Sequence, residues 1–368
     1  MMKVLFWSPA FWPELGGVQL FGVQLIRALR TRGYEFCVVT RRYTPSMAAR
    51  DSFEGVPIYR FPFRDALSSG RLEDVIDVRR GVTELKTSFA PDLVHLNEAG
   101  VDVFFHHASA AAHPSPTLLT LHGLWPDRTR DQDSVMARAL RAADSITCCS
   151  EAVLNEARLL VPEIATRSCV ITNARKEPDV VPVPLPTNEQ RLVFLGRLSP
   201  EKGFDVALAA FARIAGRFSE LRLIVAGDGP DRSKLENQAR ELGVSDRVDF
   251  LGWIEPDAVP TLLNSASIVL MPSRSEGFPL AALDAALMGR PVVATTAGGL
   301  AEAVQDGVTG LLVPPDDSVA FAAAIGRLLG EPETVRKMGA AARERVRRTF
   351  SWESHVDAFD SQYRQLTA

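Results

Sequence analysis

The sequence predicts an α/β protein with two domains, each a doubly wound parallel β-sheet covered by helices on both faces. Three observations support this fold class. The chain has 368 residues, more than a single hydrophobic core usually accommodates. Short apolar runs alternate with segments whose apolar residues recur at helical spacing, as in parallel sheets that are buried on both faces. A proline-rich stretch with little periodicity follows Lys176 and separates two such halves.

In the first half, each expected strand is a short apolar run, and amphipathic segments lie between several of them. The clearest of these segments, Val18–Arg32, predicts a helix with Leu20, Val23 and Ile26 on its buried face. The first apolar run leads directly into Pro and Gly, so we expect a strand there and no signal peptide. The expected strands are Lys3–Pro9, Phe36–Arg42, Pro57–Pro62, Leu93–Asn97, Thr117–His122, Ser145–Cys149 and Val170–Thr172.

The second half repeats this alternation and closes with three helical patterns in a row. The expected strands are Arg191–Leu195, Leu221–Ala226, Val248–Leu251, Ser267–Met271, Pro291–Ala294 and Leu311–Val313. The expected helices are Asp205–Gly216, Arg232–Leu242, Pro279–Met288, Ser318–Leu329, Pro332–Thr349 and Ser351–Leu366. We therefore expect domains over residues 1–178 and 179–350, with the helix of 351–368 packing toward the first domain. Parallel α/β sheets bind ligands beyond the carboxyl ends of their strands, which predicts a site in a cleft between the two sheets.

The composition indicates a globular protein without broad attraction to nucleic acid. Hydrophobic residues make up 46% and charged residues 23% of the chain, and the net charge is −4. Four cysteines at irregular spacing are too few for a disulfide framework, so we expect buried thiols. No apolar stretch reaches the roughly 20 residues that span a bilayer. We expect a cytoplasmic protein, with peripheral membrane contact left open.

The most informative stretch is the strand–turn–helix pattern that begins at Ser275. Gly277 permits a tight turn, and the proline two residues later suits a helix start because its missing N–H has no partner to lose there. The free N–H groups of Leu280 and Ala281 would then point toward an anion. Glu276 precedes this turn and Asp284 follows about one helical turn in, and carboxylates accept hydrogen bonds from the hydroxyl pairs of hexose and ribose. A plain turn with a capping acid is the alternative.

A second stretch, Gly196–Phe204, places two cations after the first expected strand of the second half. Arg197 supplies a planar fork of donors and Lys202 a point charge, which suits a diphosphate. Hydrogen bonds to charged groups contribute about 1.5–3 kcal/mol each, so two cations and two amides could dominate anion binding. Two solvated surface cations are the alternative.

These residues stand in a longer set of motifs that resembles a known family. The motifs are GRLSPEKGFD from Gly196, AGDGP at Ala226–Pro230, FLGW at Phe250–Trp253 and the long run Ser275–Asp317. Together they resemble the retaining glycosyltransferase family 4 (group 1), whose GT-B fold has two Rossmann-like domains facing each other across a cleft. The likeness extends more loosely to the Gly16-Gly17 loop, to His122-Gly123 and to the tail that begins at Phe350.

The resemblance implies roles for residues of the second half. Glu276 matches the glutamate that contacts the transferred sugar, and Arg197 and Lys202 match the diphosphate-binding pair. Asp284 takes the place of a glutamate that binds the ribose, and is one methylene shorter. Backbone groups of the turn and helix start, together with the loops near the nucleobase, complete the expected donor site: Gly277, Phe278, Leu280, Ala281, Gly227, Gly229, Trp253 and Ile254.

In the first half, the resemblance implies that His122 contacts the donor sugar near the reacting centre. The glycines Gly16 and Gly17 would let the backbone approach a phosphate closely. The expected partners are a nucleoside diphosphate sugar, with UDP or GDP as the nucleotide, and an unidentified acceptor, with no nucleic acid. We expect no cofactor, because the nucleotide sugar is a co-substrate.

Several other patterns compete with this interpretation and are weaker. His106, His107 and His113 lie close together, and Asp131-Gln132-Asp133 has a D-x-D form, but neither predicts a metal site. Arginines and aromatic residues of the first half could form an acceptor or membrane-facing surface: Arg27, Arg30, Arg32, Arg41, Arg42, Phe11, Trp12 and Trp125. A related phosphorylase or epimerase, and a non-catalytic sugar-nucleotide-binding protein, remain open as alternative functions.

Overall fold

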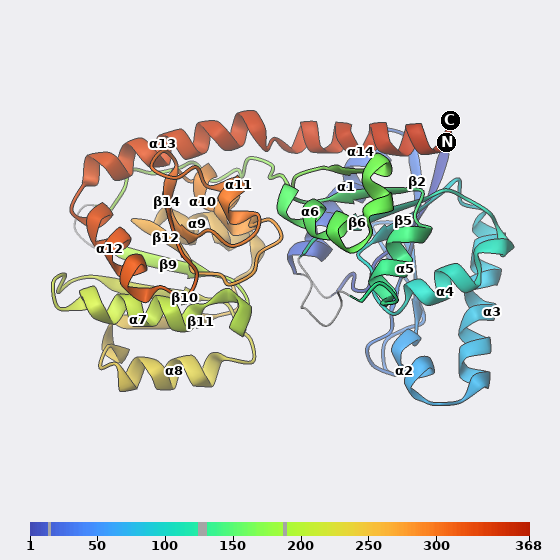
Figure 1. Cartoon of the computed structure of the whole chain (residues 1–368), viewed down its shortest axis with the longest axis horizontal. Coiled ribbons are helices and arrows are strands. Elements are labelled where there is room, and N and C mark those ends of the chain that lie inside the picture. The colour runs from blue at the N-terminus through green and yellow to red at the C-terminus, as the bar shows by residue number, and fades with distance from the viewer. Residues whose placement is uncertain (14–15, 124–130, 187–189) are drawn as a thin grey trace. The chain divides into compact units, whose positions relative to one another are not determined.

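The computed structural model describes all 368 residues except 14–15, 124–130 and 187–189 (Figure 1). The chain divides into two compact units: unit 1 comprises residues 1–171 with 354–368, and unit 2 comprises residues 172–353. The division precedes the expected boundary after residue 178. Arg175 explains the difference, because its side chain binds Asp284 and its N–H donates to the carbonyl of Phe350, both in unit 2.

Unit 1 is built on an eight-stranded sheet with the strand order β3-β4-β2-β1-β5-β6-β7-β8. Apolar residues fill both faces of its central strands; Leu5, Phe6 and Trp7 of β1 are fully buried. The strands are β1 (Met2–Trp7), β2 (Tyr34–Arg41), β3 (Arg50–Phe53), β4 (Val56–Phe61), β5 (Leu93–Asn97), β6 (Thr117–Leu121), β7 (Ser145–Cys148) and β8 (Ser168–Val170).

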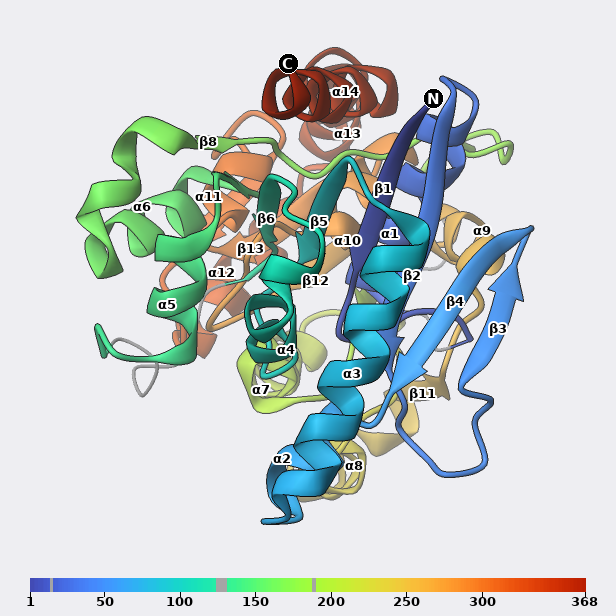
Figure 2. The same ribbon diagram turned by 90° about the vertical axis from the view of Figure 1, so that its right-hand side faces the viewer.

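The parallel sheet expected for unit 1 is confirmed, with one antiparallel strand at its edge, where β3 pairs with β4 (Figure 2). The turn between them consists of Glu54 and Gly55, whose φ angles are 50° and 78°. Two successive residues with positive φ match the twist of a tight hairpin. The sequence of β3, Arg-Asp-Ser-Phe, is polar and largely exposed, so it has no apolar run to reveal it.

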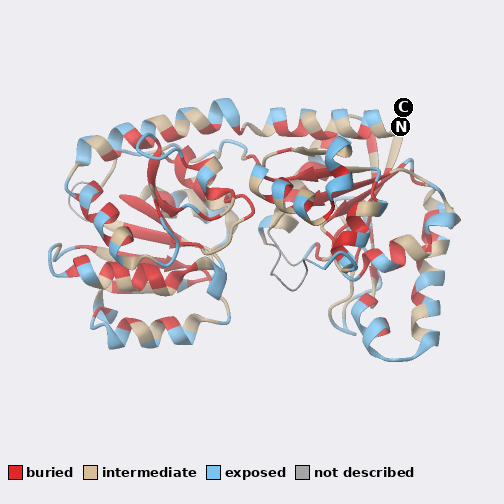
Figure 3. Cartoon of the chain, viewed as in Figure 1, coloured by how far each residue is buried: buried red, intermediate tan, exposed pale blue. Residues whose placement is uncertain are grey.

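Helices cover the sheet of unit 1, and Figure 3 shows buried strands beneath helices whose outer faces are exposed. Among them, α1 packs against β2, and α3 packs against α2 and α4. The helices are α1 (Gly17–Arg30), α2 (Phe63–Ser68), α3 (Leu72–Phe89), α4 (Val103–Ala108), α5 (Val135–Ala142) and α6 (Glu151–Leu160).

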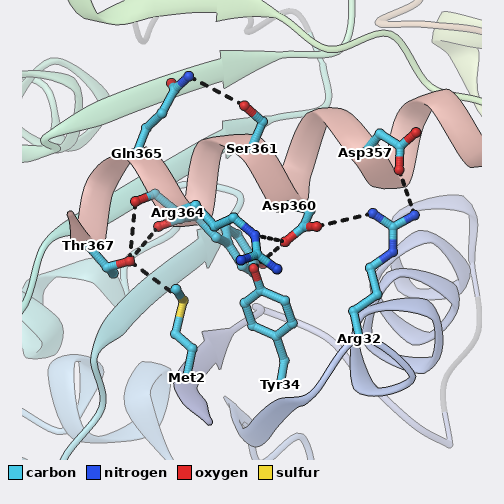
Figure 4. Close-up of polar contacts among 10 residues, drawn as sticks. Met2, Arg32, Tyr34, Asp357, Asp360, Ser361, Arg364, Gln365 and Thr367 are labelled. Atoms are coloured by element: carbon cyan, nitrogen blue, oxygen red, sulfur yellow. Dashed lines mark hydrogen bonds and ion pairs between the residues drawn. The ribbon is translucent and has the colours of Figure 1, made fainter.

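The last helix, α14 (Trp352–Thr367), completes the core of unit 1. Asp360 accepts hydrogen bonds from the hydroxyl of Tyr34 and from Arg32 at 3.2 Å (Figure 4). Tyr363 is fully buried, and its hydroxyl lies 2.6 Å from Nδ1 of His95 on β5. Ionic and apolar contacts together therefore attach the C-terminal helix to the sheet of this unit.

Unit 2 contains a six-stranded, all-parallel sheet with the strand order β11-β10-β9-β12-β13-β14. Helix α7 packs against α8 and α12, and α10 packs against α9 and α13. The strands are β9 (Arg191–Leu195), β10 (Arg222–Ala226), β11 (Val248–Gly252), β12 (Ile268–Met271), β13 (Val292–Thr295) and β14 (Gly310–Val313). The helices are α7 (Phe204–Ala215), α8 (Arg232–Glu241), α9 (Val259–Asn264), α10 (Leu280–Leu287), α11 (Leu300–Ala303), α12 (Ser318–Leu329) and α13 (Pro332–Thr349).

A search of the described residues for a membrane-crossing helix finds none with the necessary length and apolar character.

Candidate active site

The strand order of unit 2 defines where a ligand would bind. Strand β9 is first in sequence but lies between β10 and β12. The strands that follow it are added first on one side of β9 (β10 and β11) and then on the other (β12, β13 and β14). In open α/β sheets, the crevice at such a switch point, beyond the carboxyl ends of the strands, binds ligands. The loop that contains Lys202 follows β9, and the turn that contains Glu276 follows β12. The two sequence motifs therefore meet at this switch point.

Lys202 and Glu276 form a direct ion pair at this edge. Nζ of Lys202 lies 3.0 Å from Oε1 and 2.8 Å from Oε2 of Glu276. The hydroxyl of Ser273 donates to the same carboxylate at 3.2 Å. The Glu276 side chain is 11% exposed and that of Lys202 is 27% exposed, so the pair is shielded but reachable. One carboxylate and one ammonium group thus lie side by side at a partly buried position, where water screens charge interactions less than in bulk solvent.

Arg274 holds the two segments of this site together. Its guanidinium forms two hydrogen bonds with Asp205 at 2.9 and 2.7 Å and one with Asp316 at 2.6 Å. It also donates to the carbonyl of Pro200 at 2.6 Å, while its main-chain N–H donates to the carbonyl of Glu201 at 2.8 Å. The hydrogen bond with Asp205 raises the pKa of Arg274, which therefore stays charged. This network fixes the Lys202 loop against the turn after β12.

Close backbone packing at this edge requires glycine at several positions, among them Gly203 and Gly227. A Cβ on Gly203 would lie 2.0 Å from the carbonyl oxygen of Pro272, and φ at Gly203 is +68°. A Cβ on Gly227 would lie 1.9 Å from the carbonyl oxygen of Gly196, and φ at Gly227 is +138°. Both positions exclude a side chain sterically and conformationally. The loops after β9, β10 and β12 therefore pack into one continuous rim.

The start of α10 supplies the amides that the sequence predicts. Pro279 caps the helix, and its carbonyl accepts the N–H groups of Ala282 and Leu283, at 3.1 and 3.4 Å. Among the described residues, the N–H groups of Leu280 and Ala281 have no hydrogen-bond acceptor, as at any uncapped helix start. Phe278 is buried and packs edge-on against Phe350. The two amides therefore begin a helix whose N-terminal dipole favours an anion.

Arg197 differs from Lys202 in its surroundings. Its side chain is exposed, and no ion pair or hydrogen bond of its guanidinium is found within the described part of the chain. It lies six positions from Gly203 in the same loop, on the rim formed by the packed glycines. An exposed guanidinium on this rim is free to meet an incoming anion.

Asp284, which the resemblance assigns to the ribose, is engaged with another side chain. Its Oδ1 lies 2.8 Å from Nε of Arg175, and its Oδ2 lies 2.9 Å from Nη2 of the same residue. The side chains are 21% and 18% exposed. Burial raises the pKa of Asp284, whereas the Arg175 guanidinium lowers it in part. Any hydroxyl that binds Asp284 must share it with this guanidinium.

The residues expected near the nucleobase lie on the loops after β10 and β11. Gly227 donates its N–H to the carbonyl of Gly252 at 2.7 Å, which joins the two loops. A Cβ on Gly229 would lie 2.4 Å from the carbonyl oxygen of Leu198. Trp253 is 57% exposed and Ile254 is partly exposed. These side chains border the rim, and their contact with a base stays a prediction.

In unit 1, the expected residues lie at the carboxyl edge of its sheet. His122 follows β6, and its Nε2 lies 2.7 Å from Oδ1 of Asn97. Burial, assisted by the nearby His355, lowers the pKa of His122 to about 3, so the imidazole is neutral. Gly16 caps α1, which begins at Gly17. The N–H of Gly16 donates to the side chain of Gln19 at 3.0 Å and is therefore already used.

One of the competing histidines has a structural explanation. His106 is buried, with Nδ1 3.1 Å from Nζ of Lys86 and Nε2 3.2 Å from the hydroxyl of Thr117. The described residues contain no group of three or more His, Cys, Asp and Glu side chains arranged to hold a metal ion. Of the residues proposed for a basic aromatic surface, Trp125 lies outside the described residues.

The arginines of that surface do not form one free basic patch. Arg27 forms an ion pair with the Glu54 carboxylate, and Arg30 donates to the carbonyl of the same residue at 2.8 Å. Arg32 binds Asp357 and Asp360 on α14. Phe11 is buried, with 2% of its surface exposed. The guanidinium groups of Arg27, Arg30 and Arg32 are therefore engaged by partners inside unit 1.

Sequence reasoning missed four residues that shape these two edges: Ser273, Arg274, Arg175 and Glu98. Glu98 directly follows β5, just as His122 directly follows β6. Because an apolar strand was expected to end at Asn97, the position directly after it was a signal that could have found Glu98. Arg175 carried no such signal, because its role depends on a pairing with Asp284 that is distant in sequence.

Comparison with known proteins identifies this arrangement. Residues 15–175 match the family described as "Glycosyltransferase Family 4", and residues 176–345 match the family described as "Glycosyl transferases group 1". The glycogen synthase of Mycobacterium tuberculosis is 32% identical over 288 residues, which cover 74% of this chain and 68% of that protein. The chain belongs to the group 1 glycosyltransferases. The resemblance inferred from the motifs is thereby confirmed.

Other relatives of this group 1 glycosyltransferase agree. The D-inositol 3-phosphate glycosyltransferase of Mycobacterium bovis is 41% identical over 190 residues, 49% of this chain and 38% of that protein. Sucrose-phosphate synthase from Thermosynechococcus elongatus superposes with a TM-score of 0.85 at 24% identity, covering 100% of this chain and 99% of the other. Anabaena HepE, crystallised with UDP and glucose, gives 0.81 at 21% identity, with coverages of 98% and 99%. These structures confirm the GT-B fold.

Proposed function

We propose that this group 1 glycosyltransferase transfers a hexose-type sugar from a nucleoside diphosphate sugar to an acceptor hydroxyl, with retention of anomeric configuration and without a metal ion. The observation that carries the proposal is the Lys202–Glu276 pair, at 2.8 Å, on the switch-point edge of unit 2. The open N-terminus of α10 begins beside the same turn. A carboxylate for sugar hydroxyls and donors for a diphosphate therefore stand side by side.

In this proposal, unit 2 binds the donor. The diphosphate lies against the amides of Leu280 and Ala281, with the charges of Arg197 and Lys202 around it. Glu276 accepts hydrogen bonds from the hexose hydroxyls, and Asp284 contributes to the ribose side. As the anomeric C–O bond breaks, negative charge grows on the diphosphate, and preorganised donors stabilise it without reorganisation.

The acceptor hydroxyl then attacks the anomeric carbon from the face that the diphosphate leaves. The new bond joins the acceptor oxygen to this carbon, the electron pair of the broken bond goes to the diphosphate, and the departing phosphate oxygen takes the proton. We assign His122, as a neutral imidazole, to contact with the transferred sugar. The acceptor itself can be a glycan, a lipid-linked sugar or a small molecule.

Relatives support the choice of ligands without defining them. HepE was crystallised with UDP and glucose, and the names of two relatives give glycogen and D-inositol 3-phosphate as their product or substrate. A screen of UDP-, GDP- and ADP-glucose for thermal stabilisation tests donor binding, because a ligand that binds the folded state raises its stability by mass action. Release of free nucleoside diphosphate then tests turnover.

The pairing of Asp284 with Arg175 favours one alternative, a protein that binds the donor without transferring sugar. Tight donor binding with no nucleotide release, for any hydroxyl acceptor, would support that alternative. A related phosphorylase would instead cleave a glycan with inorganic phosphate to give a sugar phosphate, and an epimerase would invert a centre of the donor's sugar without moving that sugar to an acceptor hydroxyl. Stabilisation by one nucleotide sugar together with release of its nucleoside diphosphate supports the transferase; no stabilisation by any of the three contradicts it.

A further inference from the structure

The sheet of unit 1 has its own switch point. Strand β1 lies between β2 and β5. Strands β2 to β4 are added on one side of β1, and strands β5 to β8 are added on its other side. The crevice beyond the carboxyl ends of β1 and β5 is therefore the expected ligand-binding position of this sheet. The residues that directly follow these strands are Ser8 and Glu98, and His122 follows the neighbouring β6.

Glu98 has an unusual backbone conformation at this position. Its φ angle is 104°, a region that favours glycine and is strained for a residue with a Cβ. Its N–H donates to the carbonyl of Thr120 at 2.9 Å, which keeps the residue paired with β6. Glycine would occupy this conformation without strain, yet the chain carries a carboxyl side chain here.

The carboxyl group of Glu98 has no cationic partner among the described residues. Its Oε1 accepts the N–H of Ala99 at 3.4 Å, and the main-chain N–H of His122 also donates to it. Burial raises its pKa to about 7, the two main-chain donors lower it in part, and the nearby Asp102 raises it further. A partly buried carboxyl without a counter-ion costs stability, so an ion-pair role in the fold does not explain it.

The neighbours of Glu98 form a polar floor at the same edge. His122 contacts Oδ1 of the buried Asn97 at 2.7 Å, and Nδ2 of Asn97 donates to the hydroxyl of Ser8 at 3.3 Å. The Asp102 carboxylate accepts the indole N–H of Trp7 at 2.6 Å. These polar groups have side-chain partners, whereas the Glu98 carboxyl, within the described part of the chain, is held by main-chain groups alone.

We propose that Glu98 contacts the acceptor: a carboxyl oxygen of Glu98 accepts a hydrogen bond from the attacking hydroxyl and orients its oxygen. This inference rests on the proposed function, because it names the residue that positions the nucleophile of that reaction. Glu98 forms no covalent bond, and the hydroxyl proton leaves with the diphosphate as described above. When no acceptor is present, water takes the same place, and the donor is hydrolysed slowly.

Two variants of Glu98 and one control test this assignment. Glu98→Gly removes the carboxyl and relieves the strained φ, so we expect it to fold and to keep or raise Tm. Glu98→Gln keeps an oxygen that accepts a hydrogen bond. Ala90→Gly is the matched control, because Ala90 also has a positive φ, 50°, at the end of α3 but lies outside the edge described here.

The measurement is the release of free nucleoside diphosphate from whichever of UDP-, GDP- or ADP-glucose stabilises the wild type most, first with water and then with glycerol as the hydroxyl probe. We expect Glu98→Gly to keep the donor-induced thermal shift and to lower release by about tenfold or more. We expect Glu98→Gln to fall between it and the wild type, and Ala90→Gly to match the wild type.

Release by Glu98→Gly at the wild-type rate, with a normal donor-induced shift, would overturn this inference alone. A loss of Tm in Glu98→Gly would show that the carboxyl supports the fold, and would overturn it as well. No donor-induced shift in the wild type would instead remove the proposed function, and this inference with it.

Discussion

The ammonium group of Lys202 and the carboxylate of Glu276 neutralise each other, with Nζ 2.8 Å from Oε2 and 3.0 Å from Oε1. A diphosphate that binds here must therefore draw Lys202 partly away from a carboxylate that it already contacts. The carboxylate lowers the net attraction for the anion, while it provides the acceptor that a sugar needs. The affinity for the nucleotide and the affinity for the sugar are therefore coupled through the Lys202–Glu276 pair.

Glu276→Gln should separate these two effects. Removing the negative charge leaves the Lys202 ammonium unneutralised, so we expect free nucleoside diphosphate to bind more tightly, by about three- to tenfold. Transfer should fall by about tenfold or more, because the amide replaces the charged acceptor of the hexose hydroxyls. Calorimetry with the nucleoside diphosphate and a turnover assay check the two halves. Weaker nucleotide binding in this variant would mean that Glu276 does not oppose the anion.

Asp284 and Arg175 should be coupled in stability. Asp284→Ala leaves a guanidinium four-fifths buried without its partner, so we expect a loss of about 1–3 kcal/mol in the free energy of unfolding. The double variant Arg175→Met/Asp284→Leu removes both charges and should recover part of that loss. Urea unfolding of the single and double variants measures the coupling. Additive losses would show that the pair contributes nothing as a pair.

Arg274 should affect sugar transfer although it contacts neither Lys202 nor Glu276 directly, because it holds the loop that contains Lys202. Arg274→Ala frees the Lys202 loop from the turn after β12, so we expect kcat/KM to fall by about tenfold or more. Arg336→Ala is the matched control, because its exposed pair with Glu333, at 2.6 Å, lies on α13 and should leave both Tm and turnover unchanged. Equal effects of the two substitutions would show that the network around Arg274 does not position the site.

Unit 1 should lose stability in mild acid. Burial lowers the pKa of His95 from its ordinary 6.5 to about 3, so between these values the unfolded chain binds a proton that the folded chain does not. Stability is therefore complete above pH 6.5 and falls as the pH decreases, by about 1–2 kcal/mol for this residue between about pH 7 and pH 5. His95→Gln should lose less over that interval. Urea unfolding at the two pH values checks it, and an identical loss in both proteins would contradict it.

The sequence predicted the parts of this fold that depend on local pattern. The strand expected at Lys3–Pro9 lies within a few residues of the observed β1. The helix expected at Val18–Arg32 lies within a few residues of the observed α1. Strand β3 escaped prediction because its residues are polar and its formation depends on the hairpin turn at Glu54 and Gly55. A strand without an apolar face has no periodic signal.

The candidate site divides in the same way. The sequence predicts that Lys202 and Glu276 lie at one edge of the sheet, because each follows a strand of the same parallel sheet. In the structure these two strands, β9 and β12, are neighbours. The pairing of Asp284 with Arg175 and the network of Arg274 could not be predicted. They depend on side-chain contacts between segments distant in sequence, which no local pattern encodes. The position of Glu98 directly after an expected strand can be read from the sequence, but its positive φ angle is visible only in the three-dimensional structure.

The affinity of Arg197→Ala for the stabilising nucleoside diphosphate sugar is the most direct test of the anion-binding edge of unit 2. Arg197 is exposed, so its removal should leave the fold and Tm unchanged. If its guanidinium meets the diphosphate, calorimetry should show binding weaker by about thirtyfold or more, equivalent to about 2 kcal/mol or more. Donor affinity and turnover within a factor of about two of the wild type would contradict the account.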